Sequence, residues 1–214
     1  MTAYTPFIVL FATAMEADPF IASVNAIRIA SEPYPVYQTR VAGQPAVILI
    51  TGMGPEAAAC AVRTILLHYT TDMIFNCGVA GCLTGDFAVG EIVNITRAGV
   101  LESGAGANDI RLVPVRGQRL NGYPGGTLVT VAEPLFDPER RKALSRLVQL
   151  VDMEGGVIAG ICRTRHIPCQ LLKIISDDAG NREILRENLP HMSEMLARTL
   201  TRDLDRSYRP EIPA

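Results

Sequence analysis

The chain contains 214 residues, of which 48% are hydrophobic, 20% charged and 6% aromatic, and its formal net charge is −2. This length and apolar content suit one ordinary domain with a sizeable core and exclude a disordered chain. The nearly neutral charge excludes a global basic field that would attract nucleic acid or an anionic membrane. We therefore expect a single domain over residues 1–214, with neither nucleic acid nor membrane as a partner.

The first apolar run, Phe7–Ala14, is typical of a strand buried on both faces of a sheet. It is too short to cross a bilayer, and no basic segment precedes it, so it does not resemble a signal peptide. The five cysteines form no CxxC pair and the three histidines are scattered along the chain. These features favour free thiols in a reducing cytoplasm and argue against a metal site.

The segments after this first strand have the sequence patterns of a hairpin and a helix. Tyr37–Ala42 and Ala46–Thr51 have the composition of strands, and the polar turn at 43–45 joins them. Pro55 suits the first position of a helix over Glu56–Tyr69, which is rich in alanine and long aliphatic residues. This part of the chain is expected to form a hairpin followed by a helix.

The remaining segments continue to alternate between strand and helix patterns. In chain order they are a strand at Met73–Cys77, a strand at Glu91–Arg97, a long loop over 99–126, a strand at Thr127–Ala132, a helix over Pro138–Leu150 capped by Asp137, a helix over Gly155–His166, a strand at Cys169–Ile175 and a helix over Arg182–Arg206 that Pro190 kinks or splits. This alternation predicts an α/β fold with a mixed central sheet flanked by helices.

Glycine and acidic residues gather where the predicted strands end, which is where α/β sheets bind ligands. These positions are Ala14-Met15-Glu16, Gly52-Met53-Gly54, Gly78-Val79-Ala80-Gly81, Met153-Glu154-Gly155 and Ser176-Asp177-Asp178. Three separate acidic positions are therefore expected to converge on one edge of the sheet.

Six blocks occur in the order seen in the purine nucleoside phosphorylase and nucleosidase superfamily: AMEAD at 14–18, TGMGPEAAA at 51–59, NCGVAGCL at 76–83, VGEIV at 89–93, VDMEGGVIA at 151–159 and IISDDA at 174–179. The chain resembles this superfamily over nearly its whole length. It is most similar to the hydrolytic branch, which contains the methylthioadenosine/S-adenosylhomocysteine nucleosidases and the futalosine hydrolases. The resemblance implies cleavage of a purine nucleoside without a metal or an organic cofactor, and it implies a homodimer.

The resemblance also implies roles for individual side chains. Cleaving the N-glycosidic bond develops positive charge on the sugar and negative charge on the departing purine. Asp177 corresponds to the acid at the purine, and Asp178 either neighbours that acid or caps the following helix. Glu154 corresponds to the carboxylate that binds the ribose hydroxyls, beside Met153 packed on the ribose. Glu16 corresponds to the glutamate that positions and deprotonates the attacking water.

The other candidate substrate-binding residues are Gly54, Met53, Val79, Ser176 and Phe136. The glycine lets the backbone approach the ribose, and Phe136 is placed to stack on the base or to pack in the core. The segment around Phe136 also resembles the hopanoid-associated phosphorylases, which act on an adenosyl compound with a large apolar 5′ group.

Water is favoured over phosphate as the nucleophile. Family phosphorylases commonly have Arg near Asn76 and a hydroxyl near Val79, and a buried phosphate without such partners is costly. However, nucleosidases usually have serine at Val79, and many relatives have arginine at Lys173. Two alternatives stay open: a phosphorylase that uses arginines such as Arg97, Arg111 or Arg116, and a nucleoside-binding protein without activity. The intact Glu16, Glu154 and Asp177 set argues against the second.

Overall fold

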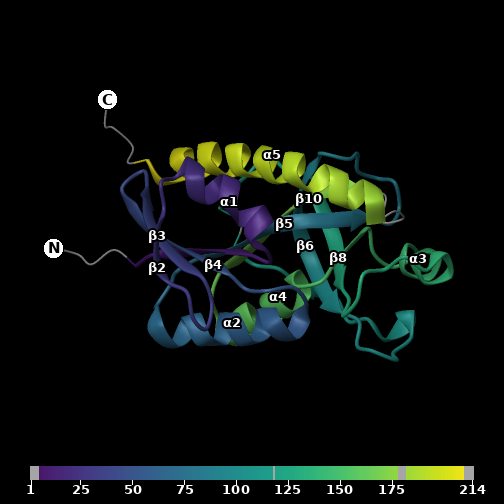
Figure 1. Cartoon of the computed structure of the whole chain (residues 1–214). Helices are drawn as coiled ribbons and strands as arrows, with labels where there is room; N and C mark the ends of the chain where they lie inside the picture. Colours follow the sequence, from purple (N-terminus) through teal and green to yellow (C-terminus); the bar gives the residue numbers. More distant parts are fainter. Residues whose placement is uncertain (1–4, 118, 178–181, 210–214) are drawn as a thin grey trace.

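The computed structural model describes residues 5–117, 119–177 and 182–209 (Figure 1). Its elements are β1 (Phe7–Phe11), α1 (Ala14–Ser23), β2 (Ile27–Ala30), β3 (Val36–Val41), β4 (Gln44–Ile50), α2 (Pro55–His68), β5 (Ile74–Cys82), β6 (Ile92–Val100), the 3-10 turn η1 (Ala107–Asp109), β7 (Val113–Pro114), β8 (Gly125–Thr130), α3 (Pro138–Leu144), β9 (Leu150–Asp152), α4 (Gly155–Thr164), β10 (Cys169–Asp177) and α5 (Arg182–Tyr208).

The strands form one mixed sheet in the order β10-β6-β8-β9-β5-β1-β4-β3-β2, with β7 beside β6. β1 is parallel to β4 and β5, whereas β2, β3 and β4 form an antiparallel edge. Because β5 also pairs with β10, the strands β5, β9, β8, β6 and β10 close into a ring. The expected α/β fold with a mixed central sheet flanked by helices is confirmed.

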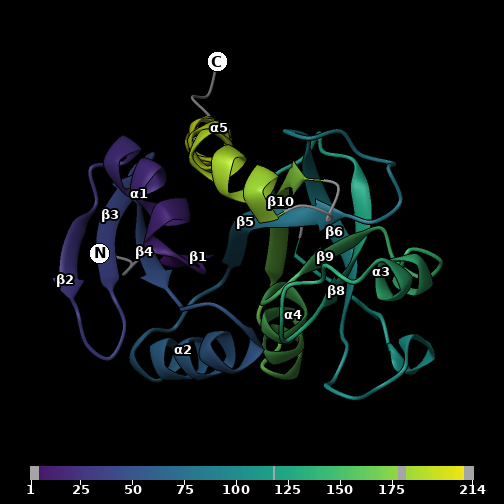
Figure 2. The ribbon, with the colours of Figure 1, turned by 45° about the vertical axis from the view of Figure 1, so that its right-hand side comes forward.

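Helices cover both faces of the sheet (Figure 1 and Figure 2). α1 and α5 pack together on one face, above the sheet in Figure 1, and α2 and α4 lie together on the other. The core under α1 and α5 contains the aromatic side chains Phe7, Phe11, Phe20 and Phe75. The core under α2 and α4 is built from aliphatic side chains and cysteines. With both faces buried, β1 is apolar throughout, as the sequence predicted, whereas β10 is equally buried but also contains polar residues such as Lys173.

The first strand is shorter than predicted, because a helix begins where the strand was expected to continue. β1 ends at Phe11, and Thr13 caps α1 in a capping box with Glu16. The Thr-x-x-Glu pattern that signals such a cap is present at 13–16. Glu16 therefore lies in the first turn of a helix and not in a loop.

Other predicted boundaries also shift. The helix expected over Pro138–Leu150 ends at Leu144, because Leu150–Asp152 pairs with β8 and β5, and pairing within the sheet overrides helical spacing. β5 continues beyond Cys77 to Cys82 because β10 pairs along that stretch. The expected loop 99–126 contains the last residues of β6, then η1, β7 and the start of β8, and α5 runs through Pro190. The edge strand β2 is short and largely exposed, so it has little sequence signal.

Candidate active site

A cavity of about 220 Å³ opens where β5, β8, β9 and β10 end. Its lining residues are Ala12, Thr13, Glu16, Met53, Val79, Ala80, Gly81, Val131, Pro134, Leu135, Phe136, Val151, Asp152, Met153, Glu154, Ser176, Asp177 and Leu189. All the site residues predicted from the sequence are among them except Gly54. The expected convergence of acidic positions at one edge of the sheet is therefore present in the fold.

Glu16 is fixed by its own helix and by β5, and only 6% of the residue is exposed. Its Oε2 atom accepts hydrogen bonds from the Thr13 N–H and the Thr13 hydroxyl, each at 3.0 Å, and Oε1 accepts from the Val79 N–H at 3.1 Å. A Cβ atom at Gly78 would lie 2.7 Å from Glu16 Oε1, so a larger residue there would displace the carboxylate. Both carboxylate oxygens thus have fixed donors at the cavity.

Glu154 lies directly before α4 and bonds to the loop before α2. The residue is 7% exposed, and its Oε1 atom accepts from the Gly54 N–H at 2.7 Å. Gly54 adopts a φ of +94°, a conformation that favours glycine. Burial and the Asp152 carboxylate raise the pKa of Glu154 to about 7, although Lys173 and the Gly54 N–H oppose this shift. Gly54 therefore contacts the cavity carboxylate without lining the cavity itself.

A buried ion pair that was not predicted lies beside these carboxylates. The Lys173 Nζ atom is 2.8 Å from Asp152 Oδ2, and both side chains are 2% exposed. Burial lowers the pKa of Lys173, but the charges of Asp152, Glu154 and Glu16 outweigh burial, and the net pKa lies above its usual value. Lys173 interrupts an apolar strand pattern, and a lysine is almost never buried without a partner. That interruption was the available sequence signal.

Asp177 and Ser176 end β10 at the cavity, and both are buried. The Ser176 hydroxyl donates to Asp177 Oδ1 at 2.7 Å, and the Ser176 carbonyl accepts from Asn188 Nδ2 at 2.9 Å. The second bond connects the end of β10 to α5. Asp178 lies outside the described residues, so both roles considered for it stay predictions.

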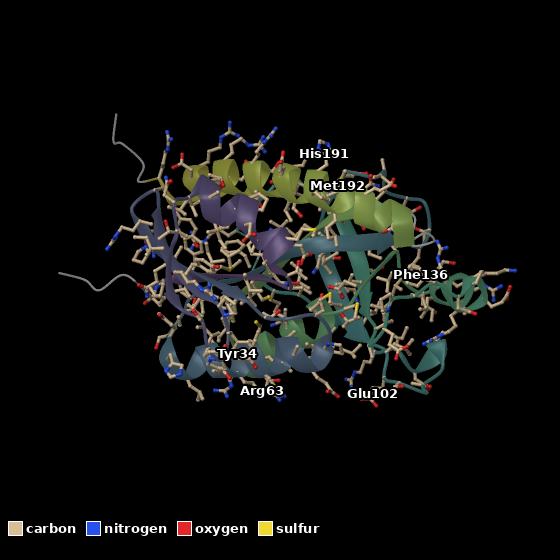
Figure 3. The ribbon with its side chains drawn as sticks, viewed as in Figure 1. Tyr34, Arg63, Glu102, Phe136, His191 and Met192 are labelled. Carbon is tan, nitrogen blue, oxygen red and sulfur yellow. The ribbon has the colours of Figure 1, made fainter. Side chains whose placement is uncertain are left out.

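The rest of the cavity wall is apolar. Met53, at the rim, is 69% exposed. Phe136 lies just before α3 (Figure 3), and Leu189 of α5 lines the same cavity. Val79 and Met153 contribute further apolar surface. This wall suits a flat aromatic ligand with few polar groups.

No Arg, Lys or His is among the described residues that line the cavity. The candidate phosphate ligands Arg97, Arg111 and Arg116 lie elsewhere, and Arg97 donates to the Leu112 carbonyl. Within the described ranges, no three His, Cys, Asp or Glu side chains are grouped to hold a metal ion. Nor does that part of the chain contain a helix long and apolar enough to cross a membrane.

The sequence of the chain matches one known protein family over most of its length. The model of the phosphorylase superfamily matches residues 6–119 and 122–204. The chain belongs to this superfamily. The resemblance seen in the six sequence blocks is therefore confirmed.

Individual relatives are more distant. A 5′-methylthioadenosine/S-adenosylhomocysteine nucleosidase of Tolumonas auensis is 24% identical in an alignment 184 residues long, gaps included, that covers 75% of this chain and 79% of the relative. The structure of futalosine hydrolase of Helicobacter pylori superimposes with a TM-score of 0.87 at 16% identity, covering 96% of this chain and 100% of the other. A methylthioadenosine/S-adenosylhomocysteine nucleosidase of the same organism gives 0.86 at 17% identity, covering 95% and 99%. At these identities, the structural likeness establishes the fold.

Proposed function

We propose that the chain hydrolyses the N-glycosidic bond of a purine nucleoside and releases the free base. The proposal rests on the placement of Glu16, Glu154 and Asp177 around one largely apolar cavity. It is supported by the names of relatives, which are nucleosidases and futalosine hydrolases.

Each carboxylate takes one task in this reaction. Glu16 orients a water molecule and accepts its proton as the water attacks the anomeric carbon. Glu154 accepts hydrogen bonds from the ribose hydroxyls, and these bonds strengthen as the sugar becomes cationic. Asp177 gives a proton to the departing purine, and the Ser176 hydroxyl holds Asp177 Oδ1. The proton taken from water and the proton given to the base balance over the turnover.

The charges around the cavity favour water over phosphate as the nucleophile. Asp152, Glu154 and Glu16 surround the single buried ammonium of Lys173, and that ammonium already forms an ion pair with Asp152. A phosphate dianion would enter beside these carboxylates, and no cation among the described lining residues would offset its desolvation. A water molecule incurs no such cost.

The finer identity of the substrate follows from the apolar wall. Phe136 is proposed to stack on the purine, with Val79 and Met153 against the base and the ribose. Met53 at the open rim suits an apolar 5′ substituent. A nucleoside of the methylthioadenosine, S-adenosylhomocysteine or futalosine type is thus the proposed substrate class.

The direct test measures release of the free base by chromatography. The substrates are methylthioadenosine, S-adenosylhomocysteine, futalosine, adenosine and inosine, each with and without phosphate. Hydrolysis predicts release that does not depend on phosphate. The Asp177→Asn variant, with its fold checked by circular dichroism, should lose most of this turnover. Release only with phosphate, with a sugar phosphate as the product, would establish a phosphorylase instead. Tight nucleoside binding with no release from any substrate would indicate a binding protein.

A further inference from the structure

Glu154 occupies the position that ordinarily caps a helix, yet its side chain does not cap α4. It directly precedes Gly155, the first residue of α4, and makes no side-chain bond to the N–H groups of that helix. Its carboxylate instead reaches the Gly54 N–H in the loop before α2. Buried N–H groups at the start of a helix need acceptors, so other residues must supply them.

Asp152 and Thr130 supply these acceptors. Asp152 Oδ2 accepts from the Gly155 N–H at 2.8 Å, and Thr130 Oγ1 accepts from the Gly156 N–H at 2.7 Å. The Thr130 hydroxyl donates in turn to Asp152 Oδ1 at 2.5 Å, so the two side chains form one buried unit. The first two N–H groups of α4 are therefore satisfied without Glu154.

Lys173 reduces the repulsion between the Asp152 carboxylate of this unit and the nearby Glu154 carboxylate. Its ammonium lies 2.8 Å from Asp152 Oδ2 and offsets the negative charge of Asp152, which lies two residues before Glu154. Without this cation, the two buried carboxylates would repel each other with little solvent screening. Neither Lys173 nor Thr130 is among the residues that line the cavity.

The glycines that begin α4 leave room for this arrangement. A Cβ atom at Gly155 would lie 2.7 Å from Asp152 Oδ2 and 2.7 Å from a Leu128 methyl carbon. One at Gly156 would overlap the Gly99 carbonyl oxygen and lie 3.0 Å from Thr130 Oγ1, so the start of α4 packs closely on both the capping groups and β6.

We propose that Thr130, Asp152 and Lys173 are positioning residues: Thr130 and Asp152 cap α4 in place of Glu154, Lys173 offsets the charge of Asp152, and together they hold the Glu154 carboxylate against Gly54 at the cavity. The consequence of this arrangement for catalysis rests on the proposed function. The orientation of Glu154 does not, and it is measurable without a substrate.

The test replaces Thr130 by Val, which removes the hydroxyl and keeps the shape of the side chain. Glu154 should then turn to cap α4, and the Gly54 N–H should lose its carboxylate partner. In ¹H–¹⁵N spectra, the Gly54 amide proton should move upfield and exchange with solvent roughly tenfold faster. Thr130→Ser retains the hydroxyl and should restore both values.

Thr127→Val is the matched control on the same strand. The Thr127 hydroxyl accepts from the Gln149 N–H at 3.1 Å and makes no bond to α4, so its loss should leave the Gly54 amide unchanged. In turnover, Thr130→Val should lower kcat/KM roughly tenfold, through both KM and kcat. Combined with Glu154→Gln, it should cause no loss beyond that of Glu154→Gln alone, because both changes act on one contact.

Two results would overturn the inference. One is an unchanged Gly54 amide in a folded Thr130→Val variant, and the other is a Thr130→Val effect that adds in full to that of Glu154→Gln. A wild-type chain that cleaves no nucleoside would refute the proposed function instead. In that case, the Gly54 amide still decides whether Thr130 positions Glu154.

Discussion

Glu16 and Glu154 are buried to the same degree in one cavity, but the fold fixes them by different means. Glu16 remains within the capping box of its own helix, where Thr13, three residues away, provides two of its three hydrogen bonds. The Glu154 side chain does not cap the helix that it precedes. It accepts a hydrogen bond from the Gly54 N–H, 100 residues earlier in the chain. One carboxylate depends on local sequence, and the other depends on tertiary contacts.

This difference has an electrostatic consequence. Glu154 lies close to Asp152, and burial together with this second charge raises the pKa of Glu154 to about 7. The same Asp152 that caps α4 therefore also raises the cost of ionising Glu154. A carboxylate positioned through other side chains is sensitive to their charges as well as to their geometry.

The largest effect is expected from Glu16→Gln, which tests whether the locally anchored carboxylate is the base. Loss of a general base should lower kcat by about 10²–10⁴-fold and leave KM nearly unchanged. The measurement is steady-state base release by the variant and the wild type. A kcat equal to that of the wild type would remove Glu16 from the mechanism.

Glu154→Gln tests the other member of the pair and should raise KM and lower kcat together, because the ribose bonds strengthen in the transition state. The amide retains an acceptor for the Gly54 N–H but loses the charge that the ribose hydroxyls bind, so kcat/KM should fall roughly tenfold to a hundredfold. A 3′-deoxy substrate should be affected less, because it lacks one of these hydroxyls. An equal loss for both substrates would contradict the ribose contact.

A pH series should distinguish the two carboxylates further. Because the pKa of Glu154 is about 7, this group is protonated in the folded protein below that pH, and KM should fall severalfold as pH rises through 7. Stability should move the opposite way. The unfolded chain releases this proton at lower pH, so from about 4.5 to about 7 the Glu154 contribution makes the free energy of unfolding decrease as pH rises. KM and Tm measured across this range should both lose these slopes in Glu154→Gln, and slopes that persist there would assign them to another group.

Thr13→Val should have the smallest effect. It removes the hydroxyl that donates to Glu16 and that accepts from the Glu16 N–H, while the Thr13 N–H and the Val79 N–H still hold the carboxylate. We expect a loss of about 1 kcal/mol in the free energy of unfolding and a change in kcat of only a few-fold. Chemical denaturation and steady-state kinetics check both values. A loss of kcat as large as that of Glu16→Gln would mean that the hydroxyl, and not the carboxylate alone, serves the reaction.

Most of the fold and of the cavity lining follows from local sequence patterns. The apolar strands, the Pro55 helix start and the glycine and acidic residues after the strands each have a local cause, and the structure contains them close to the expected places. The Thr-x-x-Glu pattern at 13–16 is a further local signal, because it predicts a helix start that includes Glu16.

The unpredicted features depend on contacts between distant segments. β9 is three residues long and exists because β5 and β8 pair with it, so no periodic pattern marks it. The same pairing places Asp152 beside Lys173, 21 positions later in the chain, and beside Thr130 in β8. Helical spacing over Pro138–Leu150 predicted a longer helix at that point, and it obscured the strand that carries Asp152.

The most direct test of the central claim is the fate of water oxygen during cleavage. The chain would be incubated with its best nucleoside substrate in H₂¹⁸O containing phosphate, and the sugar product analysed by mass spectrometry. Hydrolysis at the Glu16, Glu154 and Asp177 cavity predicts a free sugar and no sugar phosphate, formed at a rate independent of phosphate, with one ¹⁸O atom at the anomeric carbon in samples quenched before that oxygen exchanges with solvent. An unlabelled sugar 1-phosphate would contradict the account, because no cation among the described lining residues would offset the charge of a bound phosphate.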